Sequence, residues 1–244
     1  MVAFCHLAGL KNKAFKAMNI NKEIFIFIGP PGAGKGTLAQ LCTNRMGWVQ
    51  CSTGDLCRKH VIEKTSIGHQ IDLIIKSGKL ISDDLVIEMV EQWLVQNLNN
   101  CEKIILDGFP RTRMQAELLE ELLKKPQLKH VSVSVIKMEL DSETVVRRLM
   151  SRLVCGNKVC CAVYSASNPA VLQGVCAECA SPLVRRNDDI EFVIRERIAT
   201  YYAHAHDLVQ YYELLGRKVE DLSVIQPIEQ VFSQFVNLVN CKTA

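Results

Sequence analysis

The chain has 244 residues, of which 48% are hydrophobic and 23% are charged, and its formal net charge is +3 at pH 7. This composition excludes bulk disorder, and the length allows one large domain with a self-supporting core. The small charge does not indicate a nucleic-acid binder, and no apolar run is long enough to predict a membrane span.

Residues 1–22 differ from the rest because they contain lysines and no acidic residue. The lysines follow an apolar stretch instead of preceding it, which is the wrong order for a secretory signal. We expect this segment to be a disordered N-terminal extension of a single domain that spans residues 23–244.

Short apolar runs alternate with helical patterns along that domain. The runs predict strands at 24–28, 103–106 and 130–138, and a last strand that begins at 218–219. Helices are expected from the turn after the first strand to about 46, and then at 85–98, 113–125, 142–152, 190–215 and 227–239. Strands separated by helices predict a parallel sheet that is covered on both faces.

Two segments interrupt this alternation. Residues 52–81, the first insert, show only one helical piece, around 71–75, and residues 153–189, the second insert, show no helical pattern. Insertions of this length in a compact domain are more often lids or binding elements than idle loops.

The glycine-rich segment Gly29–Thr37 directly follows the first predicted strand and fits the pattern G-x4-G-K. In this pattern backbone amides, a helix N-terminus and a lysine, here Lys35, surround nucleotide phosphates. Gly36 stands where a Mg²⁺-binding hydroxyl is usual, so a carboxylate must help to hold the metal. Asp107, at the end of a predicted strand, is the candidate.

Five of the eleven cysteines fall between positions 155 and 179. Cys155 and Cys160 form one pair and Cys176 and Cys179 another, which predicts a four-thiolate structural zinc site. Cys161 competes with Cys160, and bystander thiols or a redox pair involving Cys161 are the alternatives. Because the cysteines are clustered and odd in number, we expect a reducing, cytoplasmic compartment.

Four motifs occur in register: Gly29–Thr37, Ser52-Thr-Gly-Asp55 followed by Arg58, Gly78-Lys-Leu80, and Asp107-Gly-Phe-Pro-Arg-Thr112. Over roughly residues 23–240 the chain resembles adenylate kinase in its long-lid form. The resemblance implies an α/β fold with a P-loop NTPase-type parallel sheet flanked by helices. The core would be residues 23–51, 82–152 and 190–244. The first insert would be the nucleoside-monophosphate-binding (NMP-binding) insert, and the second a zinc-ribbon-like lid.

The activity implied is the reversible, Mg²⁺-dependent transfer ATP + AMP ⇌ 2 ADP in a monomer that maintains adenine nucleotide levels. ATP, AMP and ADP would be the partners, without nucleic acid or membrane. Such a site needs positioned cations, because the transferring group spreads negative charge over its oxygens. Arginine suits this role because its planar fork grips phosphate oxygens.

The resemblance also assigns residues. The catalytic residues would be Lys35, Arg111, Arg152, Arg186 and Arg197. ATP would bind Gly32, Ala33, Gly34, Lys35, Gly36, Thr37, Arg148 and Arg152, with Arg148 stacked on the donor adenine. AMP would bind Thr53, Arg58, Lys79, Leu80, Gly108, Arg111, Gln115, Arg186 and Arg197, with Thr53 and Gln115 reading the adenine. Asp107 would hold Mg²⁺ through water.

Two positions depart from the common family pattern. Leu153 follows Arg152 where a second arginine is frequent, and Ser165 follows Val163-Tyr164 where histidine is frequent. The first cysteine pair is also wider than the usual C-x2-C, although the Ala162–Tyr164 segment that follows it favours Cys160 as the ligand.

Two other functions are compatible with parts of the sequence. A nucleoside monophosphate kinase could prefer UMP, CMP or GMP as acceptor. A regulatory or nucleic-acid-binding P-loop ATPase could carry a zinc ribbon, although the charges of the second insert are balanced where a nucleic-acid surface should be basic.

Overall fold

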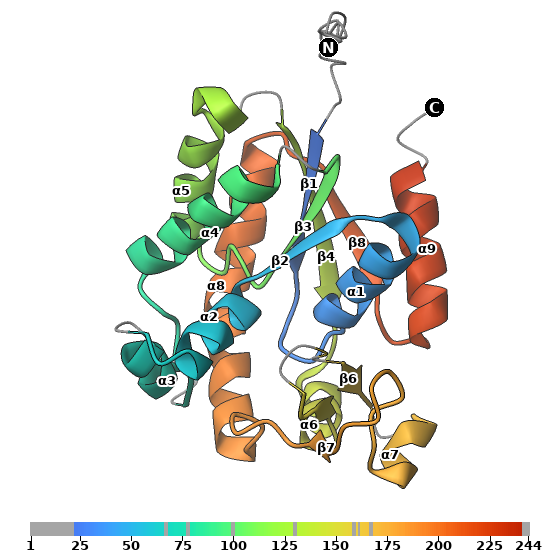
Figure 1. Cartoon of the computed structure of the whole chain (residues 1–244). Coiled ribbons are helices and arrows are strands. Elements are labelled where there is room, and N and C mark those ends of the chain that lie inside the picture. Colours follow the sequence, from blue (N-terminus) through green and yellow to red (C-terminus); the bar gives the residue numbers. More distant parts are fainter. Residues whose placement is uncertain are drawn as a thin grey trace, which may run out of the picture.

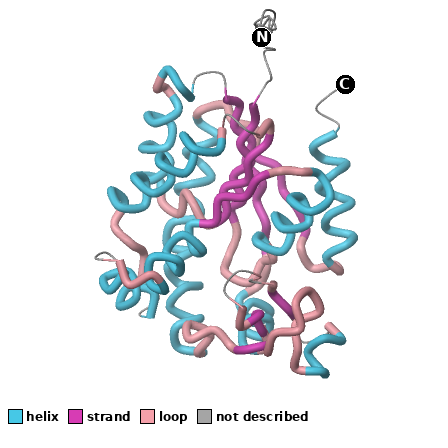
Figure 2. Tube along the Cα trace, in the orientation of Figure 1, coloured by secondary structure: helices cyan, strands magenta, loops and turns pink. Residues whose placement is uncertain are grey.

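The computed structural model describes residues 22–65, 68–76, 79–98, 101–128, 131–157, 160, 162–165 and 168–240 (Figures 1 and 2). The expected extension up to residue 21, Gly78 of the third motif and the alternative ligand Cys161 lie outside the described residues. Lys22 already belongs to the first strand.

The central sheet has five parallel strands in the order β2-β3-β1-β4-β8. Their bounds are β1 Lys22–Ile28, β2 Val49–Ser52, β3 Lys103–Asp107, β4 Val131–Glu139 and β8 Val219–Ser223. The sheet, flanked by helices, confirms the predicted P-loop NTPase-type α/β fold. Strand β2 was not predicted, because four residues that include Gln50 make no apolar run.

Helices cover both faces of the sheet (Figure 1). The alternating side chains of β1 divide between two cores, as expected for a strand buried on both faces. Ile24, Ile26 and Ile28 pack with α4, α5 and the end of α8, whereas Phe25 and Phe27 pack with α1, α6 and α9. The bounds are α1 Lys35–Met46, α4 Asp83–Asn97, α5 Arg113–Leu123, α6 Ser142–Met150, α8 Glu191–Leu214 and α9 Ile228–Asn240.

The first insert contains two helices, α2 (Thr53–Ile62) and α3 (Gly68–Lys76). Helix α3 corresponds to the predicted helical piece, but the expectation of no other helix was wrong. Helix α2 escaped detection because its sequence is polar and weakly periodic; a local cap marks its start, where the Ser52 side chain accepts a hydrogen bond from Asp55 N.

The second insert forms a small antiparallel sheet in the order β6-β5-β7 at the lower end of the molecule in Figure 1. Its strands are β5 Leu153–Cys155, β6 Val163–Tyr164 and β7 Leu183–Val184, and its helix is α7 Pro169–Gln173. The expectation that this insert lacks a helix was therefore wrong, since five residues are too few to show a period. Its buried core is small and includes Cys155 and Cys176.

No helix within the described parts of the chain has the length and apolar character needed to cross a membrane.

The aromatic cluster that fixes α9 to the sheet provides a test of this arrangement. Phe235 is fully buried, and its ring lies 5.5 Å from that of Phe27 and 5.6 Å from that of Trp48, measured between centroids. We expect Phe235→Ala to lower the free energy of unfolding by about 3–5 kcal/mol, because it removes a large ring from a packed core. Chemical denaturation measures this loss.

Phe232→Ala, one turn earlier on α9, is the matched control. Phe232 is only partly buried and meets Arg45 at 5.1 Å, so its loss should cost much less. Equal destabilisation by the two variants would contradict the packing described for α9.

Candidate active site

The glycine-rich segment lies between β1 and α1, and α1 begins at Lys35. Gly34 has a φ of 94°, a left-handed conformation that favours glycine and lets the chain turn directly into the helix. The ammonium of Lys35 donates to Gly29 O at 2.7 Å and to Pro30 O at 2.9 Å. Burial lowers the pKa of Lys35 to about 8, and the Asp107 charge opposes this shift. A partly buried cation here is suited to bind phosphate.

Asp107 ends β3 beside this segment. Its Oδ2 accepts a hydrogen bond from Gln50 Nε2 at 3.2 Å, and burial raises the pKa of Asp107, an effect that the Lys35 charge opposes. A Cβ at position 36 would lie 3.1 Å from Asp107 Oδ2. A side chain there would crowd the carboxylate, so glycine at position 36 leaves Asp107 Oδ2 unobstructed on that side.

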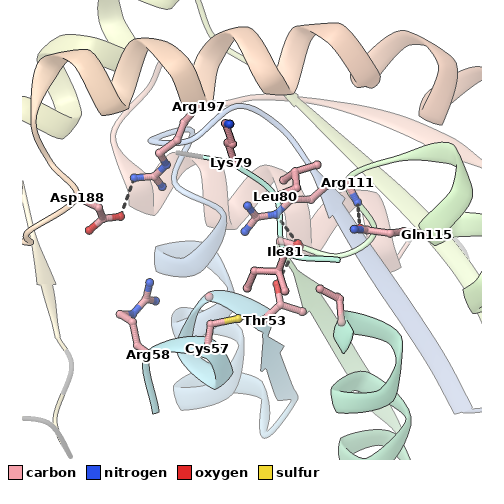
Figure 3. Close-up of a pocket in the computed structure, with 13 residues that line it drawn as sticks. Thr53, Cys57, Arg58, Lys79, Leu80, Ile81, Arg111, Gln115, Asp188 and Arg197 are labelled. Carbon is pink, nitrogen blue, oxygen red and sulfur yellow. Dashed lines mark hydrogen bonds and ion pairs between the residues drawn. The ribbon is translucent and has the colours of Figure 1, made fainter. Parts of the chain in front are cut away.

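A pocket between the sheet edge and the first insert gathers most of the predicted acceptor residues (Figure 3). In Figure 3, Arg58, Asp188 and Arg197 lie at one side of the pocket and Gln115 at the other. Its lining also contains five residues that the sequence reasoning did not assign to the site, namely Gly54, Cys57, Ile81, Val86 and Asp188. The pocket is lined by Thr53, Gly54, Cys57, Arg58, Lys79, Leu80, Ile81, Val86, Gly108, Arg111, Gln115, Asp188 and Arg197.

Of these five residues, Cys57 could have been found from its helical spacing. It follows Thr53 by one helical turn, so the two share a face of α2 once that helix is recognised. Gly54 lies inside the second motif and Ile81 directly follows the third, so both could have been found from the sequence, whereas Val86 and Asp188 are not adjacent to any motif. The structure places Arg186, also predicted to bind the acceptor, outside the lining of this pocket.

The backbone carbonyl of Gly108 holds two of the side chains that line the pocket. It accepts hydrogen bonds from Thr53 Oγ1 at 2.9 Å and from Arg111 Nε at 2.7 Å. Gly108 has a φ of 80°, and a Cβ there would lie 3.0 Å from both Thr53 Oγ1 and Arg111 Nη2. Glycine is therefore required for the threonine and the arginine to converge.

Gln115 is 2% exposed and lies in the first turn of α5. Its Oε1 accepts from Arg111 N at 2.7 Å, and its Nε2 donates to Asp83 Oδ1 at 2.8 Å. Both ends of the amide are thus engaged by the protein.

Carboxylates hold three of the candidate arginines. Arg152 makes a two-point pair with Asp189, with distances of 2.8 Å (Nε to Oδ2) and 2.5 Å (Nη2 to Oδ1). Arg197 Nη1 lies 2.9 Å from Asp188 Oδ2, and Arg58 pairs with Asp55. Such pairs reduce the cost of burying like charges close together.

Arg186 differs from these three because its side chain makes no hydrogen bond with any described residue. Burial lowers the pKa of Arg186 to about 10, and the charges of Arg58 and Arg152 contribute to this shift. Burial also lowers the pKa values of Arg111 and Arg197. The cations are therefore close enough to repel one another, which favours binding of a polyanion.

Arg148, the candidate for the donor base, lies on α6 and donates from Nη2 to Val224 O at 2.9 Å. This contact holds the guanidinium against the loop that follows β8.

The second insert brings four cysteines together. The Sγ atoms of Cys155, Cys160, Cys176 and Cys179 all lie within 4.8 Å of one another. The Cys155–Cys179 separation is 3.4 Å and the Cys160–Cys176 separation 3.6 Å. Four thiolates about 2.3 Å from a tetrahedral zinc would lie about 3.8 Å apart, so the set fits zinc and includes Cys160, the ligand favoured above.

Polar groups around the cysteines suit thiolates. Asn157 N donates to Cys155 Sγ at 3.3 Å, and the Tyr164 hydroxyl lies 3.1 Å from Cys176 Sγ. Contacts with the hydroxyl and backbone N–H of Ser181 lower the pKa of Cys179 to about 6. Hydrogen bonds of this kind orient metal ligands.

Comparison with known proteins connects this geometry to a family. The family model described as "Adenylate kinase" matches residues 27–217. The chain is 37% identical to the adenylate kinase of Fervidobacterium nodosum, covering 87% of this chain and 95% of that protein. It is 39% identical to the adenylate kinases of Archaeoglobus fulgidus, over 86% and 94% of the two chains, and of Geobacter sp., over 84% and 94%.

The lowered pKa of Lys35 predicts a pH dependence of anion binding. Phosphate binding favours the protonated ammonium, so the affinity for ATP should fall as pH rises through about 8, by up to about tenfold per unit. The ATP phosphates are already fully ionised there and add no titration of their own. Calorimetry between pH 7.5 and 9.5 measures the effect.

Lys35→Arg remains charged over this range and should show a flat profile. An affinity of the unmodified protein that does not change with pH would contradict the assigned role of Lys35.

The cysteine cluster predicts a bound metal. Cys179→Ser should weaken zinc binding by more than about tenfold, since even changes outside the ligand set cost about 10- to 100-fold, and it should lower the melting temperature. Metal analysis of purified protein measures the zinc content. Cys101→Ser, which removes a described thiol outside the cluster, should retain full zinc. Equal zinc in both variants would exclude Cys179 as a ligand.

Proposed function

Because the chain belongs to the adenylate kinase family, an enzyme family of phosphoryl transfer between adenine nucleotides, we propose that it transfers the terminal phosphoryl group of Mg²⁺-bound ATP to AMP, giving two ADP. The observation that carries the proposal is that two anion-binding sites lie close together. Lys35 of the glycine-rich segment and Arg111 of the acceptor pocket are near enough for their charges to interact. We place the transfer between these two sites.

The donor phosphates would bind the backbone amides of the glycine-rich segment together with Lys35. In the described structure the Lys35 ammonium uses the Gly29 and Pro30 carbonyls, and bound phosphate would replace these partners. Arg148 would contact the donor base beside Val224.

The acceptor nucleotide would lie along the pocket of Figure 3. Its phosphate would meet Arg58, Arg111 and Arg197 at the charged side, and its base would reach Thr53 and Gln115 at the other. The apolar side chains of Leu80, Ile81 and Val86 line the same pocket and would pack against the base.

Catalysis would rest on charge and position, because phosphoryl transfer needs little covalent assistance from the protein. Arg152 and Arg197 are held by Asp189 and Asp188. We infer that these pairs keep both arginines oriented until phosphate oxygens compete for the same hydrogen bonds. Arg186 has no such partner among the described residues, so it would bind the phosphates without first breaking an ion pair.

Asp107, which lies beside Gly36 and close to Lys35, would hold Mg²⁺ through the water ligands of the ion. When bound, the ion would neutralise charge on the donor phosphates. The four-cysteine set would hold zinc in a purely structural role, since four thiolates leave no open coordination position. The metal would stabilise a second insert whose own apolar core is small.

We further propose that the core of residues 23–51, 82–152 and 190–244 stays rigid while residues 52–81 close over AMP and residues 153–189 over ATP. Closure would exclude water and prevent hydrolysis of ATP. We propose that the unit is monomeric, as the family resemblance implies. The four-thiolate set supports a reducing, cytoplasmic location, where the reaction would maintain adenine nucleotide balance.

Arg111 provides the direct test. Its side chain lines the acceptor pocket and donates from Nε to Gly108 O. Arg111→Ala should therefore lower kcat by about 10³-fold or more, the effect typical of a lost phosphate-clamping arginine. A coupled assay with ATP, Mg²⁺ and AMP measures the turnover. Arg113→Ala, two residues away, removes an exposed arginine paired with Glu117 and should leave turnover nearly unchanged.

The same assay with UMP, CMP and GMP tests the acceptor. Faster turnover with any of these than with AMP would contradict the proposed substrate, whereas a small effect of Arg111→Ala would contradict the proposed phosphate contact.

A further inference from the structure

Asp83, the first residue of α4, is linked to the acceptor pocket by a hydrogen bond with the side chain of Gln115. Its Oδ1 accepts a hydrogen bond of 2.8 Å from Nε2 of Gln115, which lies 32 positions later in the sequence. Asp83 belongs to none of the four sequence motifs, and it does not line the pocket itself. Among the described residues, Gln115 therefore connects Asp83 to a ligand in this pocket.

The Gln115 amide has a defined hydrogen-bonding capacity. Its oxygen can accept two hydrogen bonds and its nitrogen can donate two. Arg111 N uses one acceptor position at 2.7 Å, and Asp83 uses one donor position. One lone pair and one N–H remain for a ligand in the pocket that Gln115 lines.

The two protein contacts allow only one orientation of the amide. If the amide were reversed, its NH₂ group would face the Arg111 N–H, and its oxygen would face the Asp83 carboxylate. Both contacts would then be repulsive, and a side chain that is 2% exposed has almost no water to relieve them. The carboxylate contributes the stronger constraint, because a hydrogen bond to a charged group is roughly twice as strong as a neutral one.

From this geometry we propose that Asp83 is a positioning residue that sets the specificity for the acceptor base. It holds Gln115 with its oxygen toward Arg111, an orientation that matches a 6-aminopurine, which offers an N6 donor next to an N1 acceptor. A 6-oxopurine offers the reverse order, an O6 acceptor next to an N1–H donor, and it is rejected. The inference rests on the proposed function, in which Gln115 reads the base of the acceptor.

Asp83 acts through Gln115, which lies at the side of the pocket opposite Arg58 and Arg197 (Figure 3). Gln115 contacts Arg111 through the backbone N–H of that residue, whereas the Arg111 side chain is held by Gly108 O. Losing the constraint should therefore weaken binding of the acceptor and leave the transfer step nearly unchanged, which raises KM with little change in kcat.

The experiment compares AMP with IMP, which differs only at the 6-position and N1 of the base. Asp83→Asn preserves the shape but removes the charge. Its amide can pair with either orientation of Gln115, so the stronger of the two constraints is lost and the Arg111 N–H alone remains. We expect kcat/KM for AMP to fall about tenfold through KM, kcat to stay within about threefold, and kcat/KM for IMP not to fall. The AMP/IMP ratio then decreases about tenfold or more.

Asp84→Asn is the matched control, because it removes the same charge from the same first turn of α4 at an exposed position. It should keep the ratio of the unmodified protein. Asp83→Ser, which suits a helix start, should show the same decrease as Asp83→Asn. Melting curves of all variants establish that the ratios refer to folded protein.

An unchanged AMP/IMP ratio in folded Asp83→Asn and Asp83→Ser would overturn the inference alone. An equal fall in Asp84→Asn would also overturn it, because helix charge would then be the cause. An unmodified protein that uses IMP as well as AMP would instead overturn the reading of adenine by Gln115 in the proposed function.

Discussion

The crowding of positive charge is the constraint on which the rest of this structure depends. A site that accepts two anionic nucleotides must place Lys35 and several arginines close together before any ligand arrives, and like charges in a partly buried cleft repel one another. The protein balances them with carboxylates, most closely in the Arg152–Asp189 and Arg197–Asp188 pairs. These pairs make a strongly cationic site compatible with a near-neutral chain, and they leave partners that phosphate oxygens can replace.

The parallel sheet brings the phosphate-binding residues to one edge of the molecule's central layer. Because parallel strands end at one edge, the glycine-rich segment after β1 and Asp107 at the end of β3 meet without further machinery. The two inserts bring the remaining cations to that edge, Arg58 from the first and Arg186 from the second. The second insert has only a small apolar core, and the zinc proposed for its four cysteines would supply the cross-link that its apolar residues do not.

Much of the fold could be predicted from local sequence patterns. The apolar strands and the periodic helices α5, α6 and α9 have strong local signals, and the structure confirms them. The missed elements share a physical cause. The strand Val49–Ser52 and the helix Pro169–Gln173 are too short to show a period, and Thr53–Ile62 is polar because one face lines a ligand pocket. Where function shapes the composition, the hydrophobic pattern weakens.

The sequence by itself determined the residue types and the loops that carry the chemistry, because a phosphate-binding loop is contiguous and its backbone conformation follows from its glycines. The family resemblance added the arginines that are expected to bind phosphate. Only the tertiary structure decided their partners. The contact of Gln115 with Asp83 and that of Arg152 with Asp189 join segments more than thirty positions apart, and Cys160 completes the cysteine set only when the turns of the second insert face each other. Hydrogen bonds and counter-charges of this kind depend on which loops meet in space, a property that no local pattern of residues records.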